Sequence, residues 1–163
     1  MEEKTAQNKK AITVMSVIIV LTLAVIWGHS CMNREDSSEE SGFVMRIVTP
    51  VLELIVGKGR VTEHLVRKIA HFCEYALLGA EMSLFFAGKR RRKREGLLLA
   101  MAHGLLAAFV DETIQIFSGR GPAITDIWID FAGVTAGGIF LLDVLIVWIH
   151  AARRHKTRKT TKT

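Results

Sequence analysis

The residues of this chain that could do chemistry are ionisable side chains set within long apolar runs. In residues 65–87, Arg67, His71 and Glu74 follow each other at four- and three-residue spacing, which places them on one face of a helix. An imidazole beside a carboxylate can act as a general acid or base, and an arginine can hold a phosphate or carboxylate. Because an ionisable group in hydrocarbon costs at least ~2.5 kcal/mol, this face must turn toward protein or water.

Two further apolar runs carry polar groups near one end, at the close of residues 97–117 and at the start of residues 124–149. Successive spans alternate in direction, so these groups share a level with His71 and Glu74, within about 15 Å of the outer membrane boundary at ~1.5 Å rise per residue. The candidate site residues are Arg67, His71, Glu74, Asp111, Glu112, Gln115, Arg120, Asp126 and Asp130. Convergence of three helices on one depth predicts a functional site. The structural alternative is a network of ion pairs that only fixes the packing.

Four apolar runs must position these groups, and each is long enough to cross a bilayer as a helix: 11–28, 65–87, 97–117 and 124–149. The first also fits a signal peptide or a lipoprotein signal ending at Cys31. However, the preceding Gly28-His29-Ser30 lacks the aliphatic residue expected three positions before a lipidated cysteine, which favours an uncleaved helix.

The basic segments set the orientation of these spans. Residues 89–94 and the tail 151–163 are densely cationic, and by the positive-inside rule both are cytoplasmic. We therefore predict an all-α integral membrane protein, a four-helix transmembrane bundle with both termini cytoplasmic. Its parts are an N-terminal tail (1–10), a first transmembrane helix (11–28), an outer loop (29–64), a core of three transmembrane helices (65–150) and a basic tail (151–163).

The outer loop contains a largely apolar stretch, residues 43–56, that Arg46, Pro50 and Glu53 interrupt. It is too broken to span a bilayer. A short helix lying in the membrane interface is the favoured interpretation, and a re-entrant element covering the polar groups is the alternative.

Composition limits the partners and cofactors that we expect. Half of the residues are hydrophobic, and the net charge of +6 comes from loops and tails, which argues against nucleic-acid binding. Two cysteines, Cys31 and Cys73, predict no disulfide framework. We expect no cofactor and assign no metal, because one imidazole among carboxylates is a weak signature. His71 and Glu74 with Asp111 and Glu112 remain a metal-binding alternative.

A second, sparser set of polar residues lies nearer the cytoplasmic side: Glu81, His103 and Asp143. Asp143 falls roughly opposite Asp130 around its helix, at ~100° per residue, so a structural role is favoured for this set. The small residues Gly133 and Gly137 share a face with Asp126 and Asp130 and favour close helix packing within the monomer.

The polar motifs resemble those of the VanZ-like family. The resemblance covers residues 67–138 and rests on RKIAHFCEYALLG from Arg67, DETIQIF from Asp111, then Arg120, and DIWIDFAG from Asp126. Where many members have Asn, this chain has Asp130, which adds a negative charge. The resemblance implies a multi-pass protein of the bacterial cell membrane and cell envelope. The family takes its name from a member linked to resistance to the glycopeptide antibiotic teicoplanin.

Three functions compete at this point. The first is a non-enzymatic envelope factor that binds a lipid-linked cell-wall precursor, a lipid head group or a lipoglycopeptide in the outer leaflet, with Arg67, Gln115, Arg120, Asp126 and Asp130 as ligand-binding residues. The second is a hydrolase or transferase acting on an envelope lipid, with His71, Glu74, Asp111 and Glu112 as catalytic residues and His71 as acid or base. The third is a small proton-coupled transporter. The sequence leaves the oligomeric state open.

Overall fold

The computed structural model describes the backbone of residues 2–31, 34–89, 93–119 and 123–160, and the side chains of 9–31, 45–87, 94–119 and 123–144. These residues form five helices and no strand: α1 (Glu2–Cys31), α2 (Arg34–Val56), α3 (Glu63–Lys89), α4 (Lys93–Phe117) and α5 (Ile124–Thr160). The all-helical prediction is confirmed. The apolar runs correspond to α1, α3, α4 and α5, and the predicted boundaries at Phe117 and Ile124 agree with the ends of α4 and α5.

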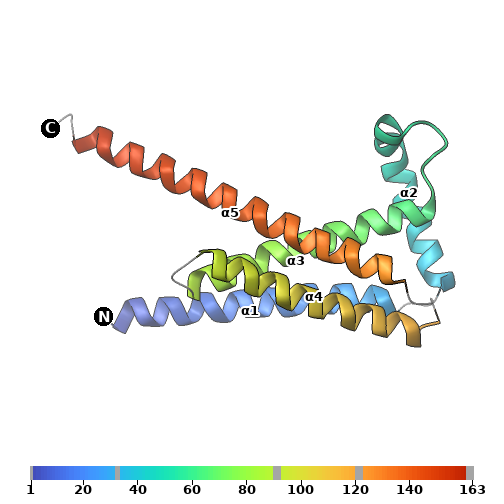
Figure 1. Cartoon of the computed structure of the whole chain (residues 1–163), viewed down its shortest axis with the longest axis horizontal. Coiled ribbons are helices and arrows are strands. Elements are labelled where there is room, and N and C mark those ends of the chain that lie inside the picture. The colour runs from blue at the N-terminus through green and yellow to red at the C-terminus, as the bar shows by residue number, and fades with distance from the viewer. Residues whose placement is uncertain (1, 32–33, 90–92, 120–122, 161–163) are drawn as a thin grey trace.

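Helices α1, α3, α4 and α5 run along the long axis of the molecule, and α2 crosses them at the end opposite to the chain termini (Figure 1). Helix α3 contacts all four other helices and is the centre of the fold. The core between them contains Tyr75 and Leu78 from α3, Ala108 from α4, Val134 from α5 and Ile26 from α1. An apolar core shared by four helices fixes how the polar faces of α3, α4 and α5 meet.

Local sequence signals define where α2 ends and α3 begins. Gly57 adopts a positive φ of 94° directly after α2, a conformation that glycine takes without steric cost. The hydroxyl of Thr62 accepts a hydrogen bond from the backbone N–H of Leu65 at 3.2 Å, so Thr62 is the N-cap of α3. These signals hold the start of α3, and with it His71, in register with α4 and α5.

Glycines allow α3 and α5 to approach closely. A β-carbon added at Gly137 would collide with the backbone carbonyl oxygen of Ala76, and one added at Gly133 would lie 2.5 Å from that of Phe72. The small residues of α5 therefore serve packing within the monomer, as the sequence pattern indicated. This packing brings Asp130 of α5 beside the polar face of α3.

Substitution of Gly137 by alanine is expected to destabilise the protein by about 1–3 kcal/mol, because the new methyl group overlaps backbone that cannot move without shifting α3. The matched control is Gly28→Ala, where a β-carbon meets nothing within 4 Å. Thermal unfolding in detergent should show a lower Tm for Gly137→Ala and an equal or slightly higher Tm for Gly28→Ala, because alanine favours a helix more than glycine does. Equal Tm values for both variants would contradict the observed packing.

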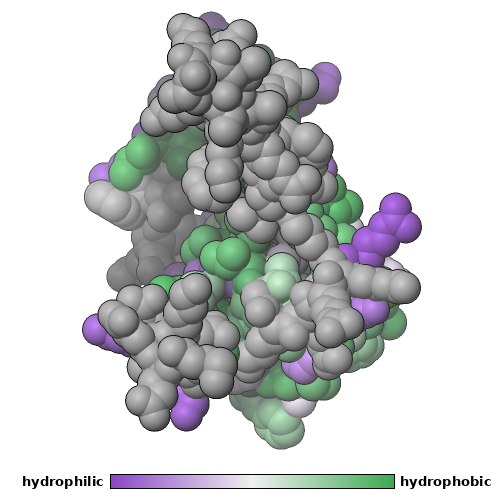
Figure 2. Space-filling view, turned by 90° about the vertical axis from the view of Figure 1, so that its left-hand side faces the viewer, coloured by the Kyte–Doolittle hydropathy of each residue, from purple (hydrophilic) through white to green (hydrophobic). Residues whose placement is uncertain are grey.

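Among the described residues, three helices are long and apolar enough to cross a membrane: 23 residues of α1 (Lys9–Cys31), 24 of α4 (Arg94–Phe117) and 21 of α5 (Ile124–Val144). Many of their exposed side chains are large and apolar, among them Val20 and Leu21 of α1 and Phe140 of α5. Apolar residues also make up much of the described surface seen from the end that carries the termini (Figure 2). Helix α3 falls outside this set of three, because His71, Glu74 and Glu81 lower its mean hydropathy.

Helix α2 is longer than predicted. The sequence indicated a short helix over residues 43–56, whereas the helix begins at Arg34 and continues through Pro50 to Val56. Its exposed face carries Ile47, Val51 and Leu54, which repeat at helical spacing. The length of the apolar stretch thus gave the correct end of α2 but not its beginning.

Candidate functional site

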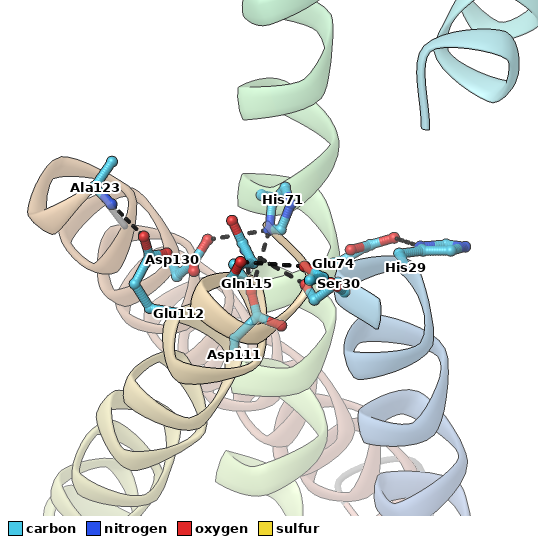
Figure 3. Close-up of polar contacts among 10 residues, drawn as sticks. His29, Ser30, His71, Glu74, Asp111, Glu112, Gln115, Ala123 and Asp130 are labelled. Carbon is cyan, nitrogen blue, oxygen red and sulfur yellow. Dashed lines mark hydrogen bonds and ion pairs between the residues drawn. The ribbon is translucent and has the colours of Figure 1, made fainter. Parts of the chain in front are cut away.

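Three side chains from three helices meet in the interior of the bundle. His71 of α3 lies with its Nδ1 atom 3.8 Å from Asp111 Oδ2 of α4 and 3.6 Å from Asp130 Oδ1 of α5 (Figure 3). Both aspartates are buried, with 0% and 1% of their surface exposed. We call His71, Asp111 and Asp130 the polar centre. It consists of an imidazole within ion-pair distance of two buried carboxyl groups.

Gln115 holds one side of the polar centre in place. One turn after Asp111 on α4, its amide Nε2 donates a hydrogen bond to Asp111 Oδ2 at 2.9 Å and contacts the hydroxyl of Ser30 at 3.4 Å. Ser30 is fully buried near the end of α1. Because an amide that bonds two neighbours has little rotational freedom, Gln115 orients Asp111 toward His71.

Two other predicted acids lie near the polar centre and have different partners. Glu112 Oε1 accepts a short hydrogen bond from the backbone N–H of Ala123, immediately before α5 begins (Figure 3). Glu74 Oε1 is 2.9 Å from Nδ1 of His29, which ties α3 to α1. Both carboxyl groups contact segments outside their own helices, so they stabilise the frame around the polar centre.

Two other predicted site residues, Arg67 and Asp126, form ion pairs outside the polar centre. Arg67 pairs with Glu63 one turn earlier on α3, at 2.6 Å, and Asp126 pairs with Lys68 at 2.9 Å. Arg67 is therefore paired within its own helix and not with Asp126 or Asp130 of α5. Arg120 lies outside the described residues.

The described structure does not form a second site from the polar residues predicted nearer the cytoplasmic side, Glu81, His103 and Asp143. Glu81 accepts a hydrogen bond from Thr22 of α1 at 3.0 Å, and His103 contacts the backbone carbonyl of Leu99 in its own helix at 2.8 Å. Asp143 is exposed, whereas Asp130 is buried on the other side of α5, as the helical geometry predicted. The three residues have separate surroundings, which agrees with structural roles.

The polar centre retains acceptor atoms without donors. Within the described side chains, Asp111 Oδ1 and Asp130 Oδ1 are buried and have no hydrogen-bond partner. Buried polar atoms without partners are rare and costly, at about 1–3 kcal/mol each. The atoms left over are carboxylate oxygens, so the site is suited to a hydrogen-bond donor or a cation and not to a bare anion.

Sequence reasoning missed several residues at and around the site. His29 and Ser30 follow the first apolar run and gave no periodic signal of their own, since their partners Glu74 and Gln115 come from distant helices. The pair of Glu63 and Arg67 did have a signal, because oppositely charged residues four positions apart in a helix often pair. That spacing could have predicted that Arg67 pairs with Glu63.

Comparison with known proteins gives one result. A family model described as VanZ/LLP1 matches residues 15–147, well over half of the 163 residues, and this range contains all the predicted site residues. No curated protein matches the chain. No solved structure matches it either.

Proposed function

The chain belongs to the VanZ/LLP1 family, and from this premise we propose that it binds the polar head group of an envelope lipid at the polar centre. The observation that carries the proposal is the pair of buried aspartates beside His71, with carboxylate oxygens that lack donors. Amine, ammonium and hydroxyl groups are the donors that such oxygens accept. Head groups of phospholipids and of lipid-linked cell-wall precursors carry these donors.

The same proposal includes the orientation of the molecule. We infer that α1, α3, α4 and α5 all span the membrane and that both termini and the basic segments 89–94 and 151–163 lie in the cytoplasm of a bacterial cell, in line with the positive-inside rule. The polar centre is then close to the outer leaflet. Helix α3 crosses the bilayer with His71 turned toward α4 and α5 and with Glu74 and Glu81 turned toward α1. Ionisable groups in membrane spans are accommodated by facing protein in this way. Reaction of an impermeant thiol reagent with Lys58→Cys in whole cells, in a protein whose exposed Cys31 and Cys73 are replaced by serine, would test this orientation.

Helix α2 fits the role of an interfacial helix in this arrangement. Its exposed face of Ile47, Val51, Leu54 and Ile55 is apolar, and amphipathic helices bury such a face at the boundary between head groups and acyl chains. An open cavity of about 620 Å³ lies against the same helix and is lined by Met45, Arg46, Thr49, Pro50 and Glu53. We propose that α2 guides lipid toward the polar centre. A lipoglycopeptide such as teicoplanin would enter the same way, which would link the protein to glycopeptide resistance.

A panel of lipid head groups tests the proposed function. The purified protein in detergent is expected to retain phosphatidylethanolamine and a lipid-linked peptidoglycan precursor in native mass spectrometry, and to release phosphatidylcholine. The physical reason is that the choline head group has no N–H or O–H to donate to Asp111 or Asp130. Equal retention of phosphatidylcholine and phosphatidylethanolamine would contradict a site built on carboxylate acceptors.

The second candidate function is catalysis on the bound lipid, and the observation that favours it is the position of His71 between two carboxyl groups. In that position the imidazole could take a proton from water or a hydroxyl group, with Asp111 and Asp130 stabilising the charged ring. The lipid extracted after the same incubation distinguishes the two functions. A product of changed mass that disappears with His71→Ala indicates an enzyme, and unchanged lipid indicates binding alone.

A further inference from the structure

We propose that His71, Asp111 and Asp130 are the protein ligands of a divalent transition-metal ion such as Zn²⁺. Each residue offers one nitrogen or oxygen atom, and the three atoms lie within 4.8 Å of one another. They come from three different helices, and two of them are buried. This set differs from the metal-binding alternative that the sequence left open, because Glu74 contacts His29 and Glu112 contacts Ala123.

The distances within the polar centre suit an ion better than hydrogen bonds. His71 Nδ1 is 3.6 Å from Asp130 Oδ1 and 3.8 Å from Asp111 Oδ2, too far for hydrogen bonds between these atoms. Ligand atoms about 2.1 Å from one tetrahedral ion lie about 3.4 Å from each other. The observed separations therefore leave room for a metal ion between the imidazole and the two carboxylates after a shift of a few tenths of an ångström.

Charge gives a second reason for a cation at this place. Asp111 Oδ1 and Asp130 Oδ1 are buried without hydrogen-bond partners among the described side chains. The neighbouring cations Arg67 and Lys68 pair with Glu63 and Asp126. Two carboxylates close together in a low-dielectric interior repel each other strongly, and a divalent ion removes that repulsion.

The chemical type of the ligand atoms limits which metals the site can bind. One imidazole nitrogen with carboxylate oxygens suits Zn²⁺ and related transition metals, whereas Mg²⁺ and Ca²⁺ prefer oxygen alone. Three protein ligands leave a coordination position for water or a ligand, as in catalytic zinc sites. The hydrogen bond from Gln115 to Asp111 is the outer interaction that orients a metal-binding carboxylate.

A metal ion would also widen the range of head groups that the site accepts. The described polar centre is acidic and repels phosphate, whereas a divalent ion with an open position binds a phosphate oxygen directly. This extension rests on the proposed head-group function. The metal site itself rests on the geometry, burial and charge of the three ligand residues and does not depend on that function.

Zinc binding to the purified, tag-free protein tests the inference. After treatment with EDTA, calorimetric titration with Zn²⁺ and elemental analysis are expected to give about one ion per chain for the wild-type protein. The variants His71→Ala, Asp111→Ala and Asp130→Ala should each lose at least roughly tenfold in affinity, and Gln115→Leu should bind about one ion with lower affinity. Asp143→Ala, an exposed aspartate on the same helix as Asp130, is the matched control and should bind like the wild type.

Elution as a single species from a sizing column establishes that each variant is folded. No tight Zn²⁺ binding by the wild type, or affinity in the three ligand variants equal to that of Asp143→Ala, would overturn the metal site. Lipid binding in the same preparations separates the two proposals. If the protein retains head groups but does not bind Zn²⁺, the proposed function stands and the metal site is ruled out. If it binds Zn²⁺ but does not retain head groups, the metal site stands and the proposed function is ruled out.

Discussion

Replacement of His71 by alanine is expected to abolish head-group binding and to lower the free energy of unfolding by about 3–5 kcal/mol. His71 lies within 3.8 Å of the buried Asp111 and Asp130, and removing it leaves two carboxyl groups facing each other without the imidazole. Loss of one partner of a buried charged pair typically has a cost of this size. Native mass spectrometry measures the lipid, and thermal or denaturant unfolding in detergent measures the stability.

The control for His71→Ala is Lys68→Ala, which breaks the pair with Asp126. About a quarter of each side chain in that pair is exposed, so its loss should cost at most about 1 kcal/mol and leave head-group binding intact. A double variant, His71→Ala with Asp130→Asn, separates stability from function. It should regain stability, because one of the two facing charges is gone, and should remain unable to bind. Full stability in His71→Ala alone would contradict the charge interactions described for the polar centre.

Much of the helical framework could be predicted from the sequence. An apolar run of about 18 residues or more has few alternatives to a helix, so all four runs were located, and the helix boundaries at Phe117 and Ile124 were correct. The first run shows where this reasoning fails. The apolar run ends at Gly28, whereas α1 continues to Cys31. Beyond Gly28, the half-exposed His29 contacts Glu74, and the buried Ser30 contacts Gln115.

The composition of the site was only partly predictable. Helical spacing placed His71, Asp111 and Asp130 at one depth, and the structure brings these three together. Spacing along one helix does not determine the contacts between helices, which depend on how the glycines of α5 fit against α3. For this reason Arg67 and Asp126, which were expected at the same site, pair with Glu63 and Lys68 instead.

The central claim is that the polar centre binds a ligand and is more than a packing network, and Asp111→Asn tests it most directly. Asparagine has nearly the same shape and keeps an oxygen for the hydrogen bond from Gln115, so the fold should be retained. Asp111 and Asp130 are two buried carboxyl groups beside one imidazole, so removing one of the two negative charges relieves their repulsion. The free energy of unfolding should therefore be unchanged or raised. Loss of a charge-assisted hydrogen bond, worth about 1.5–3 kcal/mol, should weaken head-group binding by about tenfold or more.

The measurement is the affinity of purified Asp111→Asn for phosphatidylethanolamine, compared with Asp143→Asn as the control at an exposed aspartate. The account predicts a folded Asp111→Asn protein, at least as stable as the wild type, that binds at least about tenfold more weakly, while Asp143→Asn binds normally. A folded Asp111→Asn protein with wild-type affinity, or one that loses stability while it keeps its lipid, would show that the buried aspartate serves packing alone.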